Sequence, residues 1–182
     1  MTERAAVSVA DLDVMPAAAA APLLDSCCGS REWVRRMLGR RPFGSADALL
    51  RSADEVWWAL ERADWLEAFA HHPRIGERDS AAPQDARARA WSAGEQLGVA
   101  RADAGVRASL ADGNREYERR FGHIYIVCAS GRSAEEMLAF LRERLANDAA
   151  TELRVAAGEQ AKITRLRLLK LVGADARASA PA

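Results

Sequence analysis

Two of the three histidines in this sequence are neighbours, in the segment His71-His72-Pro73-Arg74-Ile75-Gly76. An imidazole can transfer a proton near pH 7, which makes histidine a common acid/base group. Pro73 disfavours the helical conformation of the residue before it, so the pair should lie where a helix ends and a loop begins. Functional polar groups are often carried on such loops. A purely structural role is the alternative for either histidine.

A metal site at this pair is disfavoured. Adjacent residues seldom bind one ion together, and neither His-x-x-x-His nor Glu-x-x-His occurs nearby. The cysteines, Cys27, Cys28 and Cys128, lack Cys-x-x-Cys spacing, and their odd number is not typical of a disulfide framework. We therefore expect no metal and a reducing compartment. Cys128 follows a run of apolar residues with no evident activating base, so a nucleophilic role is not expected.

A second candidate is the segment Ser92-Ala93-Gly94-Glu95-Gln96. On a helix, Ser92, Glu95 and Gln96 lie at positions i, i+3 and i+4 and share one face. Their hydroxyl, carboxylate and carboxamide would suit a polar heterocycle. A solvated helix face fits the same spacing. Gly94 weakens a helix unless something must approach the backbone closely.

Arg167 is a third candidate, because it shares a helical face with Ala156, Gln160 and Ile163 that is otherwise directed to the core. A buried guanidinium needs a partner. That partner is either a protein carboxylate such as Glu95 or an anionic substrate held by two hydrogen bonds.

Helical patterns must position these groups. Capping-box spacing predicts helix starts at Ser52 and at Ser133, and the second helix should bury Met137, Phe140, Leu141 and Leu145. Another helix can begin at Asp64 and end before Pro73. Further helices are expected at about 84–97, 109–120 and 149–172, with a loop at 77–83. The predicted packing residues are Asn114, Tyr117, Phe121, Trp57, Trp58, Trp65 and Trp91.

The stretch 123–129 is the one β-like segment, bounded by Gly122 and Ser130-Gly131. It should be short, extended and buried. The predicted fold is therefore an all-α, single-domain multi-helix bundle over residues 1–172, with one short extended segment around 123–129. Residues 173–182 should form a flexible C-terminal tail.

Composition excludes several classes of function. The 182 residues carry 26 basic and 26 acidic side chains, so no broad field should attract nucleic acid or an anionic membrane. No apolar run reaches the roughly 20 residues that span a bilayer. No phosphate loop, dinucleotide motif or Gly-x-Ser-x-Gly motif is present. With no secretion or peroxisomal signal, we expect a cytoplasmic, bacterial-type protein.

Ordered motifs run from about Val9 to Val172. They are Phe69-Ala70-x-His72-Pro73-Arg74-Ile75-Gly76-Glu77, Ser92-x-x-Glu95-Gln96, Asn114-x-x-Tyr117-x-x-x-Phe121-Gly122, Cys128-Ala129-x-Gly131-Arg132, Leu141-x-x-Arg144-Leu145-x-Asn147-Asp148, Glu152-Leu153 and Lys162-Ile163-Thr164-x-Leu166-Arg167-Leu168. With these motifs the sequence resembles the 2-oxo-4-hydroxy-4-carboxy-5-ureidoimidazoline (OHCU) decarboxylase family. That family catalyses the third step of the uricase route from urate to allantoin.

The resemblance implies an all-helical homodimer that decarboxylates OHCU to (S)-allantoin without a metal or organic cofactor. It implies that His72, and not His71, is the catalytic acid/base, together with Glu95 and Arg167. Glu95 would either orient His72 or bind the ureido group of the substrate. The implied substrate-binding residues are Pro73, Ser92, Gln96, Tyr125, Ile126, Val127, Cys128 and Ala129.

Two features depart from the family pattern. His123 stands where an aromatic or apolar residue is usual, and the spacing from His72 to Ser92 suggests an insertion within 77–85. A non-catalytic helical interaction module of a urate-degradation complex is the alternative function, although the intact site residues argue against it. A DNA-binding helical domain is a third option, which the zero net charge disfavours.

Overall fold

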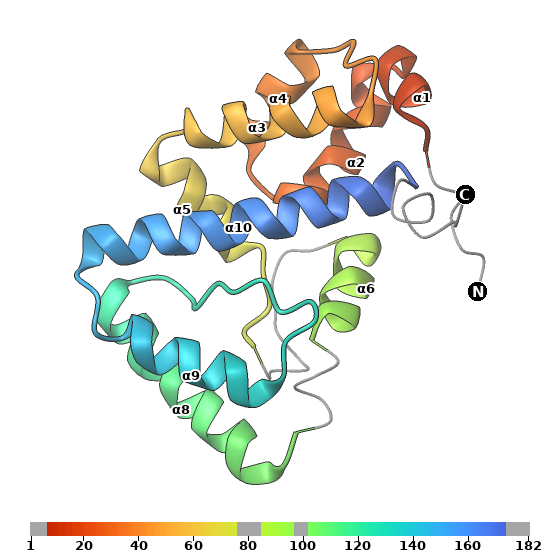
Figure 1. Cartoon of the computed structure of the whole chain (residues 1–182). Coiled ribbons are helices and arrows are strands. Elements are labelled where there is room, and N and C mark those ends of the chain that lie inside the picture. Colours follow the sequence, from red (N-terminus) through yellow and green to blue (C-terminus); the bar gives the residue numbers. More distant parts are fainter. Residues whose placement is uncertain (1–6, 76–84, 97–101, 174–182) are drawn as a thin grey trace. The chain divides into compact units, whose positions relative to one another are not determined.

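The computed structural model describes residues 7–75, 85–96 and 102–173, and these residues form α-helices without any β-strand. The all-α prediction is thereby confirmed. The chain divides into two compact units (Figure 1). The first contains the residues up to Asp64 and those from Ala161 onward, and the second contains Trp65–Gln160. The predicted loop at 77–83 and most of the predicted tail lie outside the described residues.

The first unit begins with α1 (Val9–Val14), α2 (Ala17–Cys28), α3 (Arg31–Gly39) and α4 (Ala46–Trp58). Three of these helices have a serine at the N-cap. The side chains of Ser8, Ser30 and Ser45 each accept a hydrogen bond from a backbone N–H group in the first turn of α1, α3 and α4. Helix α3 packs against both α2 and α4. The buried side chains of this unit include Leu12, Leu24, Trp33, Met37, Leu49 and Trp57.

The predicted capping box at Ser52 is wrong. Ser52 lies inside α4, whose N-cap is Ser45, and the Ser45 hydroxyl accepts a hydrogen bond from Ala48 N–H at 3.2 Å. The Ser-x-x-Glu spacing is only local, so it recurs inside helices as well as at their starts. Of the two neighbouring tryptophans on this helix, Trp57 is buried and Trp58 is exposed.

The second unit contains α6 (Ala86–Glu95), α8 (Ala104–Phe121) and α9 (Ala134–Arg144). Helix α5 (Arg62–Ala70) enters this unit, and α10 (Ala149–Leu171) begins in it and ends in the first unit. Helices α8 and α9 lie side by side (Figure 1). The predicted capping box at Ser133 is confirmed, with both reciprocal hydrogen bonds present. Helix α8 begins earlier than predicted, because the Asp103 carboxylate caps it by accepting Val106 N–H at 2.9 Å.

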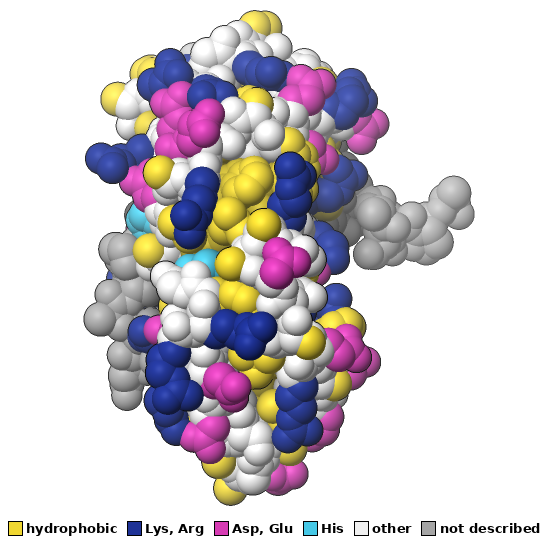
Figure 2. Space-filling view, turned by 90° about the vertical axis from the view of Figure 1, so that its left-hand side faces the viewer, with side chains coloured by type: hydrophobic (Ala, Val, Ile, Leu, Met, Phe, Trp, Pro, Cys, Tyr) yellow, Lys and Arg dark blue, Asp and Glu magenta, His cyan; other side chains and the backbone are white. Residues whose placement is uncertain are grey.

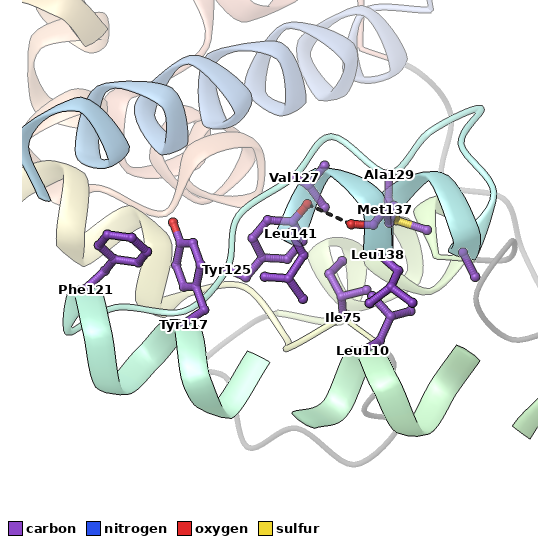
Figure 3. Close-up of a cluster of buried hydrophobic side chains, with 11 residues drawn as sticks. Ile75, Leu110, Tyr117, Phe121, Tyr125, Val127, Ala129, Met137, Leu138 and Leu141 are labelled. Carbon is purple, nitrogen blue, oxygen red and sulfur yellow. Dashed lines mark hydrogen bonds between the residues drawn. The ribbon is translucent and has the colours of Figure 1, made fainter. Parts of the chain in front are cut away.

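An apolar core joins α8, α9 and the chain between them (Figure 3). Its buried members are Ile75, Leu110, Tyr117, Phe121, Tyr125, Val127, Ala129, Ala134, Met137, Leu138 and Leu141. Phe140 was predicted to share this core but is 38% exposed, and the Arg132 guanidinium lies 4.3 Å from its ring centroid. The face of α9 that enters the core therefore excludes Phe140.

The surface carries both signs of charge. Acidic and basic side chains are interspersed on the face shown in Figure 2, as the zero net charge leads one to expect. Within the described part of the chain, no helix is both long enough and apolar enough to cross a bilayer.

Candidate active site

His72 follows the last turn of α5. The backbone N–H of His71 donates to Ala68 O at 3.2 Å, and that of His72 donates to Phe69 O at 3.0 Å. These bonds close the helix end, and Pro73 follows. The side chains of His72 and Pro73 are half-buried, between solvent and the unit interior. His71 Nδ1 lies 3.2 Å from Glu67 O on its own helix.

Two side chains of α8 hold the residues that follow His72. The Arg74 guanidinium donates from Nε to Glu118 Oε1 at 2.5 Å and from Nη2 to Glu118 Oε2 at 2.9 Å. One turn earlier on α8, Asn114 Nδ2 donates to Ile75 O at 2.8 Å. The Ile75 side chain enters the apolar core beside Leu110 and Leu138 (Figure 3). The chain after His72 is thus fixed at three points: the Arg74 side chain, the Ile75 carbonyl and the Ile75 side chain.

Helix α6 carries the second group of predicted site residues. The Asp85 carboxylate caps this helix by accepting Ala88 N–H at 2.7 Å. Ser92 is buried, whereas Glu95 and Gln96 are half-buried at the helix end. The alternative prediction, that this face of the helix is simply exposed to solvent, is therefore wrong for Ser92. An added Cβ at Gly94 would have no neighbour within 4 Å among the described residues.

The predicted backbone-binding segment is buried throughout. All five residues from Tyr125 to Ala129 are at most 8% exposed. The segment pairs with no strand among the described residues, and side chains bind two of its backbone groups. Arg144 Nη1 donates to Ile126 O at 2.7 Å, and Cys128 N–H donates to Glu159 Oε2 at 2.8 Å. The Tyr125 hydroxyl donates to Met137 O at 3.2 Å (Figure 3).

Arg144 belongs to a buried ionic network. Its guanidinium donates to Glu152 Oε1 from Nε at 2.8 Å and from Nη2 at 2.6 Å, and the Tyr117 hydroxyl donates to the same oxygen. Asn147 Nδ2 donates to the other carboxylate oxygen at 2.7 Å. Burial raises the pKa of the Tyr117 hydroxyl, and the Glu152 carboxylate adds to that rise. Burial likewise raises the pKa of Tyr125 to about 12. Both phenols are therefore neutral hydrogen-bond donors at neutral pH.

The charge of a residue on α6 affects a group in the segment from Tyr125 to Ala129. Burial raises the pKa of the Cys128 thiol, and the negative charges of Glu159 and Glu95 raise it further. The charge of Glu95 thus acts at Cys128. The thiol stays protonated near neutral pH, which agrees with the expectation that it is not a nucleophile.

Arg167 lies in the first unit, on the C-terminal part of α10. It is buried, and its Nη1 donates to Ser26 O at 3.4 Å. The predicted core-directed face is confirmed, and the carbonyl of Ser26 is one of its partners. Its positive charge also acts on the Cys28 thiol, whose pKa burial raises to about 12. Arg154 and Arg165, on the same helix, are exposed.

His123, the departure from the family pattern, lies among aromatic rings. Its centroid is 5.3 Å from that of Phe69, 5.5 Å from that of Tyr117 and 6.3 Å from that of Phe121. Its Nδ1 lies 3.0 Å from Ile124 O. The imidazole of His123 therefore packs among aromatic rings, as the aromatic residue usual at this position would.

The structure places most predicted site residues in the second unit: His72, Pro73, Ser92, Glu95, Gln96 and the residues from Tyr125 to Ala129. It gives Asn114, which was predicted to be a packing residue, the further role of an anchor, and it adds three residues to which sequence reasoning assigned no role: Arg144, Glu152 and Glu159. A signal existed for the two glutamates. Glu152, Ala156 and Glu159 share one helical face that continues to Arg167, so charged residues recur along a core-directed stripe.

No cluster of three or more His, Cys, Asp and Glu side chains that could hold a metal ion occurs in residues 7–75, 85–96 and 102–173.

Comparison with known proteins defines the class to which this helical fold and site belong. The family model for OHCU decarboxylase matches residues 13–169. The chain is 34% identical over 134 residues to 2-oxo-4-hydroxy-4-carboxy-5-ureidoimidazoline decarboxylase of Amia calva, covering 72% of this chain and 75% of that protein. It is 40% identical over 152 residues to uric acid degradation bifunctional protein TTL of Arabidopsis thaliana. That match covers 83% of this chain but about half, 47%, of the Arabidopsis protein.

A solved structure extends the comparison. The crystal structure of OHCU decarboxylase in the presence of (S)-allantoin superposes with a TM-score of 0.72 at 37% identity, covering 84% of this chain and 98% of that chain. A crystal structure of (S)-allantoin synthase, at 17% identity and a TM-score of 0.66, shares the fold over 91% of this chain and 54% of that chain. The chain belongs to the OHCU decarboxylase family.

Proposed function

We propose that this protein decarboxylates OHCU to (S)-allantoin, with His72 as the acid/base. The observation that carries the proposal is the likeness, at 37% identity, to an OHCU decarboxylase crystallised in the presence of (S)-allantoin, 98% of whose chain is covered. The candidate residues fit this reaction, because a proton-transfer group follows α5 and polar groups on α6 lie within electrostatic reach of the segment from Tyr125 to Ala129.

In the reaction, the bond between the quaternary ring carbon and its carboxylate breaks and CO₂ leaves. The electron pair of that bond is taken up by the unsaturated ring of the substrate, so the substrate supplies its own electron sink. A cofactor is needed where a substrate lacks such a sink. The electron pair forms a double bond to the neighbouring, ureido-bearing carbon, whose C=N electrons move to the ring nitrogen, which takes up a proton. His72 then delivers a proton to one face of the ureido-bearing carbon while the hydroxyl of the decarboxylated carbon loses its proton and becomes a carbonyl, which yields one enantiomer of allantoin.

The other residues bind and orient the substrate. Ser92 and Gln96 offer hydrogen bonds to the polar ring, and Glu95 either orients the imidazole or accepts from the ureido group. Pro73 and the backbone of Tyr125, Ile126, Val127, Cys128 and Ala129 contact the ring. Arg167 holds an anionic or carbonyl oxygen. We further propose a cytoplasmic homodimer that uses neither metal nor organic cofactor.

The test uses OHCU made freshly from urate with uricase and the following hydrolase. We expect the protein to accelerate the loss of OHCU and to yield optically active allantoin, followed by circular dichroism. His72→Ala should abolish this acceleration, and His71→Ala should largely retain it. A wild-type protein that changes neither the decay rate nor the chirality would exclude the proposed function. Equal losses in the two variants would exclude the assignment of His72.

A further inference from the structure

Asn114 and Glu118 lie one turn apart on α8 and bind successive residues of the segment that follows His72. Asn114 Nδ2 donates to Ile75 O at 2.8 Å, and Glu118 accepts two hydrogen bonds from Arg74. The spacing i, i+4 places both side chains on the same face of the helix. We propose that these two side chains are positioning residues for His72, which rests on the decarboxylase function proposed above.

The geometry favours such a role because the chain at His72 has left the helix. The His72 N–H bond to Phe69 O fixes the residue on its N-terminal side. Pro73 donates no backbone hydrogen bond; it fixes its own φ and disfavours a helical conformation at His72, but leaves the residues after it unconstrained. The path of the chain on the C-terminal side therefore depends on Arg74 and Ile75. Both residues are bound by α8, so α8 contributes to the placement of the imidazole.

The two contacts differ in strength. Asn114 is 3% exposed, and its bond to the Ile75 carbonyl is buried. Leaving a buried carbonyl unpaired is costly. The Arg74–Glu118 pair is partly exposed, with side chains 41% and 26% accessible, so solvent weakens it. Asn114 should consequently contribute more to the placement of His72 than Glu118 does.

The Asn114 Oδ1 atom points to a functional constraint at this position. Among the described residues it is buried without a hydrogen-bond partner. A residue selected only for packing would not bury an unsatisfied oxygen on a helix whose other buried residues are largely apolar. The amide is retained here for its Nδ2 donor, which no apolar residue of similar size can supply.

The test combines kinetics with hydrogen exchange in the full chain. Asn114→Ala should lower kcat by about 10- to 100-fold while KM changes less than about 3-fold, because a small misplacement of a catalytic group has effects of this size. Glu118→Gln should lower kcat by about 2- to 5-fold, since its partly exposed ion pair contributes less. Asp112→Asn is its matched control: it removes the same charge from α8, but its partner is the exposed Arg115. It should leave kcat unchanged.

Asn114→Asp provides an isosteric variant and a pH readout. Its ionised oxygen would face the Ile75 carbonyl and repel it, so kcat should be low at pH 8. Protonation at lower pH restores a donor, and kcat relative to the wild type at the same pH should recover. A flat ratio across pH would contradict a positioning role for the Nδ2 donor.

Hydrogen exchange decides the inference independently of turnover. Exchange of the backbone amides of His71, His72, Arg74 and Ile75 should rise in Asn114→Ala well above that in Leu145→Ala, which removes a partly buried side chain packed against the same core. Equal exchange in the two variants would overturn the proposal even if the wild type has no decarboxylase activity. An active wild type whose kcat survives Asn114→Ala within about 2-fold would overturn it while the proposed function stands.

Discussion

Two non-helical segments of the second unit carry proposed site residues, and different kinds of contact fix them in place. The segment from His72 to Ile75 is mostly half-buried and is tied to α8 by a neutral amide and a partly exposed ion pair. The segment from Tyr125 to Ala129 is fully buried and is tied by the buried charges of Arg144 and Glu159. In the function proposed above, the first holds the side chain that exchanges protons, and the second presents backbone groups to the substrate.

This difference follows from what each segment must do. A proton-transfer group needs contact with substrate and solvent, and the anchors of this segment bind Arg74 and Ile75, the second and third residues after His72. A backbone surface needs only a fixed shape, and buried ionic hydrogen bonds provide that at the cost of desolvation. The comparison predicts that anchors of Tyr125–Ala129 affect folding strongly, whereas anchors of His72–Ile75 affect mainly catalysis.

The largest effect is expected for Arg144→Met. This change leaves the buried Glu152 carboxylate without its cation and Ile126 O without its donor. Breaking such a pair should lower the free energy of unfolding by about 3–5 kcal/mol, measured by urea denaturation. The double variant Arg144→Met/Glu152→Leu should recover part of this loss, because no uncompensated charge remains. A loss below about 1 kcal/mol in Arg144→Met would remove the distinction between the two segments.

Glu159→Leu is expected to have the next largest effect. It leaves the buried Cys128 N–H without its acceptor, which should cost about 1–3 kcal/mol and raise KM for OHCU by distorting the backbone surface. Glu159→Gln keeps an acceptor oxygen and should retain most of both properties. Glu143→Leu, at an exposed glutamate of α9, is the control. If the Gln and Leu variants of Glu159 behave alike, the hydrogen bond does not fix the segment.

Several helix boundaries and the buried stretch could be predicted from the sequence. The capping box at Ser133, the long C-terminal helix, the helix end before Pro73 and the buried stretch after Gly122 follow from local periodicity and turn chemistry. The position of Arg167 on a core-directed face followed from the helical repeat. These features depend on residues within one or two turns of one another, where the pattern carries the information.

The anchors were not accessible in the same way. Asn114 and Ile75 are separated by 39 residues, and Glu159 and Cys128 by 31, so periodicity does not reveal them as partners. The helices before Ser45 were not predicted either. Helix α2 contains Pro22 and an alanine-rich run that lacks a marked apolar stripe, so its burial is decided by packing against α3.

A smaller effect is expected from alkaline pH. The pKa of Tyr125 is raised to about 12 from an ordinary value of 10.0, so the folded protein binds this proton more tightly than the unfolded chain. Stability from this group is complete below pH 10 and is lost as pH rises toward 12, up to about 3 kcal/mol. The unfolding free energy of the wild type should therefore fall relative to Tyr125→Phe between pH 9 and pH 11. If the difference in unfolding free energy between the wild type and Tyr125→Phe stayed constant over this pH range, burial would not raise the pKa of Tyr125 in the folded protein.

The smallest effect is expected for His123→Phe, which changes a contact between the residues that precede the two segments. The His123 ring packs on Phe69, three residues before His72, and precedes the buried segment by two residues. Phenylalanine would gain apolar contact with the surrounding rings but lose the Nδ1 contact with Ile124 O. These terms nearly offset, so we expect a stability change within about 1 kcal/mol and a kcat within about twofold. A much larger loss of kcat would show that His123 couples the two segments, because its ring is the contact that joins α5 to the start of the buried stretch.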